Sequence, residues 1–205
     1  MNKKGLFITL EGGEATGKTT QIKKIRNWLK ENKLPHLITR EPGGTNTAEK
    51  IRKIILSKNK PISIETEVFL IMAARIEHIN SKIIPALKKG KIVICDRFVD
   101  STAVYQGFYN SFGINEIYKL HKSYLNNFLP KLTFFFDADL NITKSRIRKR
   151  KNRNKYDMTN DIFNKKIKRG YYKVIKSKRR FKIINASLSE KEVFKSLIKE
   201  IKKII

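Results

Sequence analysis

The sequence predicts an α/β fold in which a parallel five-stranded sheet carries helices on both faces. Five short apolar runs, rich in β-branched and aromatic residues, recur along the 205-residue chain, and stretches with helical spacing separate them. The connections between successive runs are long enough for crossover helices, which favours parallel pairing of the strands. A glycine-rich segment directly after the first run adds a third observation, because it indicates a strand–loop–helix unit near the amino terminus.

The elements follow in order along the chain. The expected strands are the apolar runs Leu6–Leu10, Leu37–Thr39, Ile92–Cys95, Leu132–Phe136 and Phe181–Ile184. The expected helices have apolar residues three and four positions apart. They cover Gln21–Leu29, the stretch around Ile51–Ile55, Val68–Leu87, Ile114–Phe128, Ile142–Ile147, Ile162–Ile175 and Val193–Ile204. We find no internal repeat and no Pro-, Gly- or Ser-rich linker, so we expect a single domain over residues 1–205.

The composition is that of a globular protein, with 40% hydrophobic and 31% charged residues, which argues against a disordered chain. No apolar run approaches the ~20 residues that are needed to cross a bilayer. The few residues before the first strand leave no room for a secretory signal. The single cysteine, Cys95, excludes an internal disulfide and a cysteine-based zinc site. We therefore expect a cytoplasmic protein with no membrane partner.

The net charge is +28, from 46 Lys and Arg against 18 Asp and Glu. Such a charge ordinarily indicates a nucleic acid or an anionic surface as partner. However, 34 of the 46 basic residues are lysines, and the chain also holds 29 Ile and 16 Asn, three residue types that share A/T-rich codons. Biased coding is therefore the favoured explanation, and a nucleic-acid partner is not expected. The alternative, a nucleic-acid-binding ATPase, rests on this charge alone.

Residues 12–19, directly after the first apolar run, match G-x-x-x-x-G-K-[ST] in full. The glycines let backbone N–H groups converge on phosphate oxygens, and the helix that follows directs its positive end at the same anion. Lys18 should reach the β- and γ-phosphates, and the Thr19 hydroxyl should bind Mg²⁺. The expected ATP-binding residues are Gly12, Gly13, Glu14, Ala15, Thr16, Gly17, Lys18, Thr19 and Thr20. This motif predicts a three-layer P-loop nucleotide-binding fold.

A carboxylate at the end of the Ile92–Cys95 run adds to the nucleotide site. Ligands of open parallel sheets lie at the carboxyl ends of the strands, so Asp96 should lie beside the phosphate loop and hold Mg²⁺ directly or through water. The chain has no Asp-x-x-Gly, which a GTPase switch needs, and its length disfavours helicases and motors. The N-K-x-D match at residues 154–157 follows basic residues instead of an apolar strand, so it does not predict guanine binding. A small kinase remains.

Three arginines indicate the kind of acceptor. Arg40 follows the second run, Arg97 follows Asp96, and Arg75 lies in the sequence A-A-R. Guanidinium groups suit phosphate and base edges because they form directed, bidentate hydrogen bonds. An acceptor that already carries a phosphate is therefore favoured over a nucleoside. Kinases of other nucleoside monophosphates stay open at this point.

These residues resemble the thymidylate kinase family from Leu6 to about Ile198. The most specific matches are T-R-E-P-G-G-T at 39–45, A-A-R at 73–75, and D-R-F at 96–98 followed by Ser101 and by Y-Q-G at 105–107. The resemblance implies a P-loop kinase of nucleoside monophosphates that phosphorylates dTMP to dTDP with ATP and Mg²⁺, a step in dTTP synthesis. It also implies a homodimer and a lid segment at about 148–161.

The resemblance also implies roles for individual residues. Glu14 would lie near the sugar 3′-hydroxyl and the attacked phosphate, and Arg40 and Arg97 would bind the dTMP phosphate. Arg75 would hydrogen-bond the thymine edge, and Tyr105 would exclude a ribose 2′-hydroxyl. The dTMP site is completed by Pro42, Ile71, Ser101, Thr102 and Gln106, with Ile71 at the position where the family usually has phenylalanine.

The family places a catalytic cation either in the phosphate loop or in the lid. Ala15 stands where one class has arginine, so the chain resembles the bacterial class whose lid supplies the cation. The basic run Arg146–Lys155 falls at the lid, and Arg153, Lys155 or both should complete the site. An unchanged turnover rate after alanine substitution of both would contradict this. The catalytic residues implied in all are Lys18, Arg97, Asp96, Glu14, Arg153 and Lys155.

Overall fold

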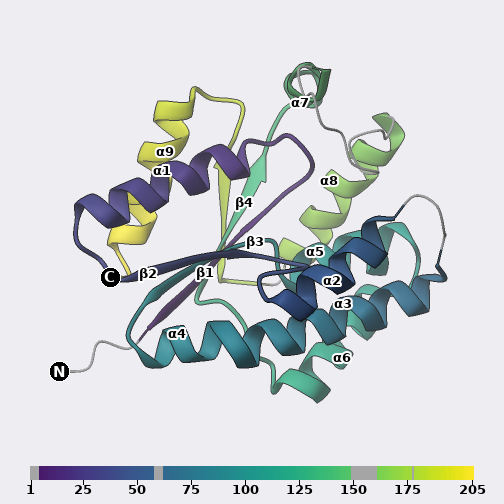
Figure 1. Cartoon of the computed structure of the whole chain (residues 1–205). Helices are drawn as coiled ribbons and strands as arrows, with labels where there is room; N and C mark the ends of the chain where they lie inside the picture. Colours follow the sequence, from purple (N-terminus) through teal and green to yellow (C-terminus); the bar gives the residue numbers. More distant parts are fainter. Residues whose placement is uncertain (1–4, 58–61, 149–160, 177) are drawn as a thin grey trace.

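The computed structural model describes residues 5–57, 62–148, 161–176 and 178–205. A five-stranded parallel sheet forms its centre (Figure 1). The strand order is β2-β3-β1-β4-β5. The strands are β1 Leu6–Glu11, β2 His36–Arg40, β3 Ile92–Asp96, β4 Leu132–Asp137 and β5 Phe181–Asn185. The predicted α/β class and all five predicted strands are confirmed.

Each strand extends one residue further at its carboxyl end than its apolar run. The added residue is polar in every case: Glu11, Arg40, Asp96, Asp137 and Asn185. Because parallel strands end at the same edge of the sheet, these five residues share one rim. β1 lies in the middle of the sheet, paired with β3 on one side and β4 on the other, so the loop that follows it opens at the centre of this rim.

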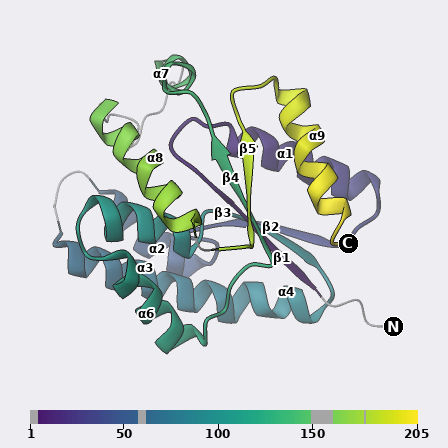
Figure 2. The ribbon, with the colours of Figure 1, turned by 180° about the vertical axis from the view of Figure 1, so that it is seen from behind.

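Helices cover both faces of the sheet (Figure 2). One face carries α1 and α9, and the other carries α3, α4, α6 and α8, while α2 packs on α3. The bounds are α1 Lys18–Glu31, α2 Asn46–Leu56, α3 Ile64–His78, α4 Ile84–Lys88, α5 Val99–Thr102, α6 Ile114–Leu125, α7 Leu140–Arg148, α8 Asp161–Ile175 and α9 Glu190–Lys202, with π-helical turns η1 Ile79–Ile83 and η2 Ala103–Tyr109. The three-layer arrangement is as predicted.

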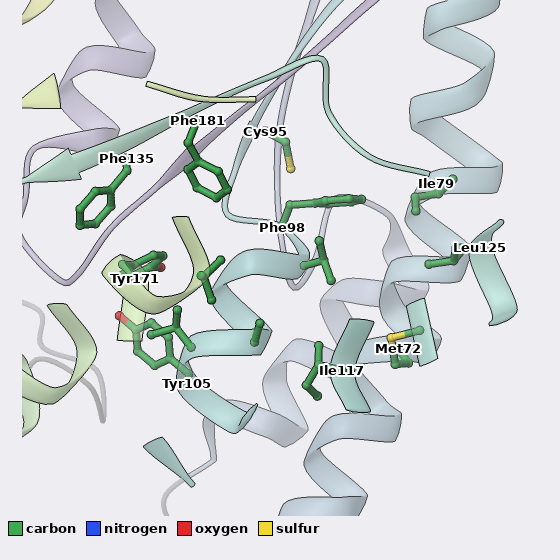
Figure 3. Packing of buried hydrophobic residues seen from close by; sticks show 14 of the residues in the cluster. Met72, Ile79, Cys95, Phe98, Tyr105, Ile117, Leu125, Phe135, Tyr171 and Phe181 are labelled. Atoms are coloured by element: carbon green, nitrogen blue, oxygen red, sulfur yellow. The ribbon is translucent and has the colours of Figure 1, made fainter. Parts of the chain in front are cut away.

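Two apolar cores lie on the two faces of the sheet. Neighbouring residues of β1 point to opposite faces, so Phe7 belongs to one core and Ile8 to the other. The larger core holds Phe135 of β4, Phe98, and the ring of Tyr171 from α8 (Figure 3). Tyr171 stacks on Phe135 with ring centroids 5.0 Å apart. These contacts fix α5 and α8 against the sheet, next to the rim where the strands end.

The helices differ from the prediction in two places. The expected helix over Val68–Leu87 is longer and consists of α3, η1 and α4 in succession. α6 ends at Leu125, three residues earlier than predicted, because Asn126 and Asn127 adopt left-handed backbone conformations. The segment 99–109, which holds α5 and η2, was not predicted as helical. Residues 99–107 are all buried, with Asp100, Ser101, Thr102 and Gln106 among apolar neighbours, so no apolar stripe contrasts with an exposed polar face.

The lid predicted at about 148–161 lies outside the described residues except for its two end positions. None of the helices in the described part of the chain is both long enough and apolar enough to cross a membrane.

Candidate active site

The phosphate loop joins β1 to α1 and needs glycine at defined positions. Gly12 has φ 143°, and a Cβ atom there would lie 2.8 Å from the Phe136 carbonyl oxygen. Gly17 has φ 95° and directly precedes the first residue of α1. Both conformations are rare for residues with a side chain. The loop therefore turns back over the sheet and presents the amino end of α1 to the rim, as an anion site requires.

Lys18, at the start of α1, reaches back over this loop. Its Nζ atom donates hydrogen bonds to the carbonyl oxygens of Gly12 (3.0 Å) and Gly13 (2.7 Å). Burial lowers the pKa of Lys18 to about 8, an effect that Arg97 reinforces and that Asp96 and Glu14 oppose. The lysine is thus held as a partly desolvated cation beside the centre of the rim.

Arg97 approaches the same loop from β3. Its Nη1 atom donates to the Gly12 carbonyl oxygen at 2.9 Å, and its Nη2 atom lies 2.6 Å from Glu14 Oε1. The backbone of Arg97 has φ 68°, a left-handed conformation that is uncommon for a residue with a side chain. Its N–H donates to the Leu10 carbonyl oxygen, which fastens this strained position to β1. The turn after β3 thereby directs the guanidinium over the phosphate loop.

Glu14 and Tyr105 close the other side of Arg97. The Tyr105 hydroxyl donates to Glu14 Oε1 at 3.3 Å, and the Arg97 guanidinium lies 5.1 Å from the centre of the Tyr105 ring. Glu14 and Tyr105, each expected beside the sugar of the acceptor, thus lie together next to Arg97.

Asp96 ends β3 next to Lys18 and Arg97, and Thr19 lies one residue beyond Lys18. The Oδ1 atom of Asp96 is buried and has no hydrogen-bond partner among the described residues, so this carboxylate is available to a cation. The same residues contain no cluster of three or more His, Cys, Asp or Glu side chains that could hold a metal by themselves. A hydroxyl and a carboxylate fit Mg²⁺ that is bound largely by nucleotide phosphates and water.

Arg75 lies on α3 and is completely buried. Its Nε atom donates to Glu41 Oε2 at 2.7 Å and its Nη2 atom to Thr102 Oγ1 at 2.8 Å. Burial alone would raise the pKa of Glu41, but Arg75 and His78 outweigh it and keep that pKa below its usual value. His78 in turn binds Thr39 Oγ1 through Nε2 (2.6 Å). The predicted base-binding arginine is thus fixed by a buried chain of polar groups.

Arg40 lies at the outer rim of the site. Its Nη2 atom is 3.0 Å from Glu49 Oε2, and the side chains are 55% and 36% exposed. Pro42 is held by Arg52, whose Nη1 atom donates to the Pro42 carbonyl oxygen at 2.8 Å. Arg40 is therefore solvent-accessible and paired, in contrast to Arg97, whose side chain is only 18% exposed.

The remaining predicted residues are held by neighbours that the sequence did not reveal. Gln106 Nε2 donates to Glu67 Oε1 at 2.7 Å, and Ile71 is buried beside Arg75 on α3. The Ser101 hydroxyl, predicted to line the base, donates to Glu11 Oε2 at 2.5 Å and lies 3.1 Å from Arg97 Nη1. Its hydrogen bonds thus join it to Arg97 and Glu11.

One cavity of about 810 Å³ brings these groups together. Every residue predicted to bind dTMP lines it, as do Lys18, Thr19, Thr20 and Asp96. Gly12 and Gly13 are not on its wall; they lie beneath Lys18 and receive its hydrogen bonds. Arg153 and Lys155 lie outside the described residues. A cavity of this size fits small ligands such as nucleotides.

Two arginines on the cavity wall were missed as individual site residues. Arg146 of α7 donates to the carbonyl oxygens of Ala15 and Ala186, and Arg52 of α2 lies beside Pro42. Arg146 had been counted only as the first residue of a basic run. No pattern in the sequence distinguishes either from the many solvated basic residues of the chain.

Comparison with known proteins gives the family. A family model described as thymidylate kinase matches residues 10–197. A thymidylate kinase of Clostridium novyi (strain NT) is 42% identical over 201 residues, 96% of this chain and 98% of that protein. The chain belongs to the thymidylate kinase family. A thymidylate kinase of Geobacillus sp. (strain WCH70) is 45% identical over 195 residues, which is 93% of each chain.

A member of the thymidylate kinase family with a known structure shares the fold. The crystal structure of thymidylate kinase from Ehrlichia chaffeensis matches with a TM-score of 0.76 and 30% identity, covering 97% of this chain and 98% of that one. The structural match is therefore nearly end to end.

Proposed function

We propose that this member of the thymidylate kinase family transfers the γ-phosphoryl group of ATP to dTMP, giving ADP and dTDP. One observation carries the proposal: Lys18 and Arg97 meet at the same atom, the Gly12 carbonyl oxygen, at 3.0 and 2.9 Å. Lys18 belongs to the loop that suits the phosphates of ATP, whereas Arg97 comes from the side of the cavity that Tyr105 and Arg75 line. Two phosphate groups bound by these cations would face each other across Gly12.

The reaction needs charge compensation more than covalent chemistry. An oxygen of the dTMP phosphate forms a bond to the γ-phosphorus, and the bond from that phosphorus to the β–γ bridging oxygen breaks, with ADP as leaving group. Lys18 would stabilise the charge that develops on the transferred group, and Arg97 would hold the attacking phosphate in line. Glu14 releases Arg97 when the phosphate takes its place.

Thr19 and Asp96 are the residues that we propose for Mg²⁺. Bound Mg²⁺ neutralises phosphate charge and orients the β- and γ-phosphates. Asp96 supplies a buried oxygen that has no hydrogen-bond partner in the described part of the chain, and Thr19 supplies a hydroxyl at the start of α1.

The deeper part of the cavity would receive the deoxynucleoside. Tyr105 is buried and hydrogen-bonded to Glu14, so its ring would occupy the space that a ribose 2′-hydroxyl requires. Arg75, Thr102 and Gln106 present polar groups on that side, and Ile71 gives an aliphatic wall. Such a pocket favours a base with a methyl group over one without it, since burial of a methyl group is favourable.

A homodimer is proposed from the surface of α3. Residues 61–81 contain no lysine, although the chain has 34. On α3 the exposed side chains include Phe69, which is 55% exposed, and Ala73. Coding bias would place lysine on this surface as on others, so its absence favours contact with a second copy. The substrates of the proposed reaction favour the cytoplasm as its location.

Turnover of purified protein with ATP, Mg²⁺ and a panel of nucleoside monophosphates tests the function. We expect dTMP to be preferred over dUMP, CMP, AMP and GMP. Preference for a different monophosphate would establish the alternative, another P-loop nucleoside monophosphate kinase. Hydrolysis of ATP that only nucleic acid stimulates would contradict both.

A further inference from the structure

A buried cluster of a carboxylate and two hydroxyls lies directly behind Arg97. Glu11 is the last residue of β1, Ser101 lies on α5 and Tyr171 on α8, so three separate elements meet there. Glu11 and Tyr171 are both 0% exposed. Glu11 Oε2 accepts from Ser101 Oγ at 2.5 Å and from Tyr171 Oη at 3.1 Å, and Glu11 Oε1 accepts from the Phe98 N–H at 2.7 Å.

The same two hydroxyl oxygens contact Arg97. Ser101 Oγ is 3.1 Å and Tyr171 Oη is 3.2 Å from Arg97 Nη1. Guanidinium is purely a donor and an ionised carboxylate purely an acceptor, while a hydroxyl has one proton. Each hydroxyl can therefore give its proton to Glu11 and turn a lone pair towards Arg97. Burial raises the pKa of Tyr171, so its hydroxyl stays protonated and able to donate.

The ionisation of Glu11 and the position of Arg97 support each other. Burial and the nearby Asp100 raise the pKa of Glu11 to about 7, whereas Ser101, Arg97 and Phe98 lower it. Arg97 in its observed place thus favours the carboxylate form of Glu11, and the carboxylate form orients the hydroxyls that hold Arg97. Glu11 and Tyr171 are not among the described residues that line the cavity, so these two act on a ligand through Arg97 and Ser101, which do line it.

The Tyr171 ring is fixed independently of its hydroxyl. It stacks on Phe135, and a Cβ atom at the preceding Gly170 would lie 2.8 Å from Phe108 and 2.9 Å from Val104. α8 therefore packs too closely on η2 to shift easily, and removal of the hydroxyl alone should leave the packing unchanged.

We propose that Glu11 and Tyr171 are positioning residues that hold the Arg97 guanidinium against the Gly12 carbonyl oxygen, in the orientation that receives the acceptor phosphate. The inference rests on the proposed function, in which Arg97 binds the phosphate of dTMP. It assigns a role to two residues from β1 and α8 that do not line the cavity.

Tyr171→Phe is the decisive variant and Tyr172→Phe its matched control. Tyr172 also lies on α8, its ring also contacts Phe135, with centroids 5.6 Å apart, and its hydroxyl also donates to a carboxylate, Asp137 Oδ2, at 2.6 Å. We expect Tyr171→Phe to lower kcat/KM for dTMP about 5- to 30-fold, as for one lost hydrogen bond to a charged group. The KM for ATP should match that of the control, whereas the melting temperature should fall by a few degrees, because the buried Glu11 loses a hydrogen-bond donor.

A second variant, Glu11→Gln, tests the carboxylate of the cluster. Glu11→Gln should lower kcat/KM for dTMP at least as much as Tyr171→Phe, because an amide can donate and so turns the hydroxyls away from Arg97. If that variant does not fold, Tyr171→Phe alone decides. Equal kcat/KM values for dTMP in Tyr171→Phe and Tyr172→Phe would overturn the proposal. So would a Tyr171→Phe variant that loses kcat/KM for ATP and for dTMP to the same extent.

Isothermal titration calorimetry of dTMP binding compares Tyr171→Phe with Tyr172→Phe in the absence of turnover. We expect the Kd for dTMP to rise about 5- to 30-fold in Tyr171→Phe and to stay unchanged in Tyr172→Phe. A wild-type protein that turns over a different monophosphate refutes the proposed function and not the positioning role, which is then measured with that acceptor. Equal Kd values in the two variants overturn the positioning role whatever the acceptor is.

Discussion

Arg97 and Glu14 form an ion pair at the centre of the cavity, with Arg97 Nη2 2.6 Å from Glu14 Oε1. The two side chains are 18% and 13% exposed, so a ligand can reach both. In the free protein Glu14 therefore occupies N–H groups that we assign to the acceptor phosphate. In the proposed reaction, binding of that phosphate would exchange a carboxylate partner of Arg97 for a dianion and would make Glu14 available to the sugar next to it.

Loss of the Arg97 side chain should impair use of the acceptor. We expect Arg97→Ala to lower kcat/KM for dTMP about 10²- to 10³-fold, as is typical for loss of one preorganised charge-stabilising donor. Arg97→Lys keeps the charge but not the forked geometry, so we expect it to lower kcat/KM for dTMP less than Arg97→Ala does. Steady-state kinetics with varied dTMP give both values. Arg26→Ala, on the exposed surface of α1, is the matched control, and an equal loss there would contradict the assignment.

The pH dependence of ATP use should reveal Lys18. Its pKa is lowered to about 8 by burial, so the free protein loses this cation as the pH rises through that value. We expect kcat/KM for ATP to decline above about pH 8, since this parameter reports ionisations of the free enzyme. A profile that stays flat from pH 7 to 9.5 would refute the assignment.

The lowered pKa of Lys18 should also make the folded protein more stable as the pH rises, whereas it makes the use of ATP less efficient. The folded protein releases the Lys18 proton at about pH 8, whereas the unfolded chain keeps it up to about 10.5. Between these values the unfolded state binds more protons, so this residue makes the free energy of unfolding rise with pH. Denaturant titrations of the wild type and of Lys18→Met, which cannot titrate there, should differ in this slope.

The buried Glu41–Arg75 pair should contribute far more to stability than the exposed Arg40–Glu49 pair. Glu41→Gln leaves the Arg75 charge buried with a weaker partner, and we expect a loss of about 3–5 kcal/mol in the free energy of unfolding. Arg40→Ala should cost about 0–1 kcal/mol, because its pair is largely in solvent. Urea denaturation measures both. Similar values for the two variants would show that the buried pair is not a structural support.

The lysine-free surface of α3 should be a contact between two copies of the chain. We expect Phe69→Lys to convert a dimer into a monomer in sedimentation or light-scattering experiments, because it would place a charge in an apolar contact. Ile183→Lys on the edge strand β5 is the control, since Ile183 is similarly exposed at 51%. A wild-type protein that is monomeric at micromolar concentration contradicts the homodimer.

The sheet could be predicted from the sequence because its strands are short apolar runs. The phosphate loop could be predicted because its motif lies between a strand and a helix. It did not reveal α5 and η2, although the most family-specific residues lie there. In this segment Asp100, Ser101, Thr102 and Gln106 are buried polar residues. Periodicity detects helices through an apolar face that contrasts with an exposed polar one, and this contrast is missing because residues 99–107 are all buried.

The residues that hold Arg97 in place could not be predicted from the sequence either. Glu11 and Tyr171 are 160 positions apart, and only the folded chain brings them to one side of Arg97. Ser101 is predicted to line the base, and its hydroxyl also bonds to Glu11 and Arg97, contacts that the motif does not indicate. A motif indicates which residue types a ligand needs, but not which other side chains occupy their hydrogen-bonding groups.

The left-handed backbone at Arg97, φ 68°, sets a limit for protein engineering. For a residue with a side chain this conformation costs about 1–3 kcal/mol, a cost that glycine avoids. Arg97→Gly would relieve this cost, but it would also remove the ion pair with Glu14 and the hydrogen bond to Gly12, and with them the proposed phosphate site. Stabilised forms that remain active have to be sought elsewhere, for example on the solvent-facing side of α9.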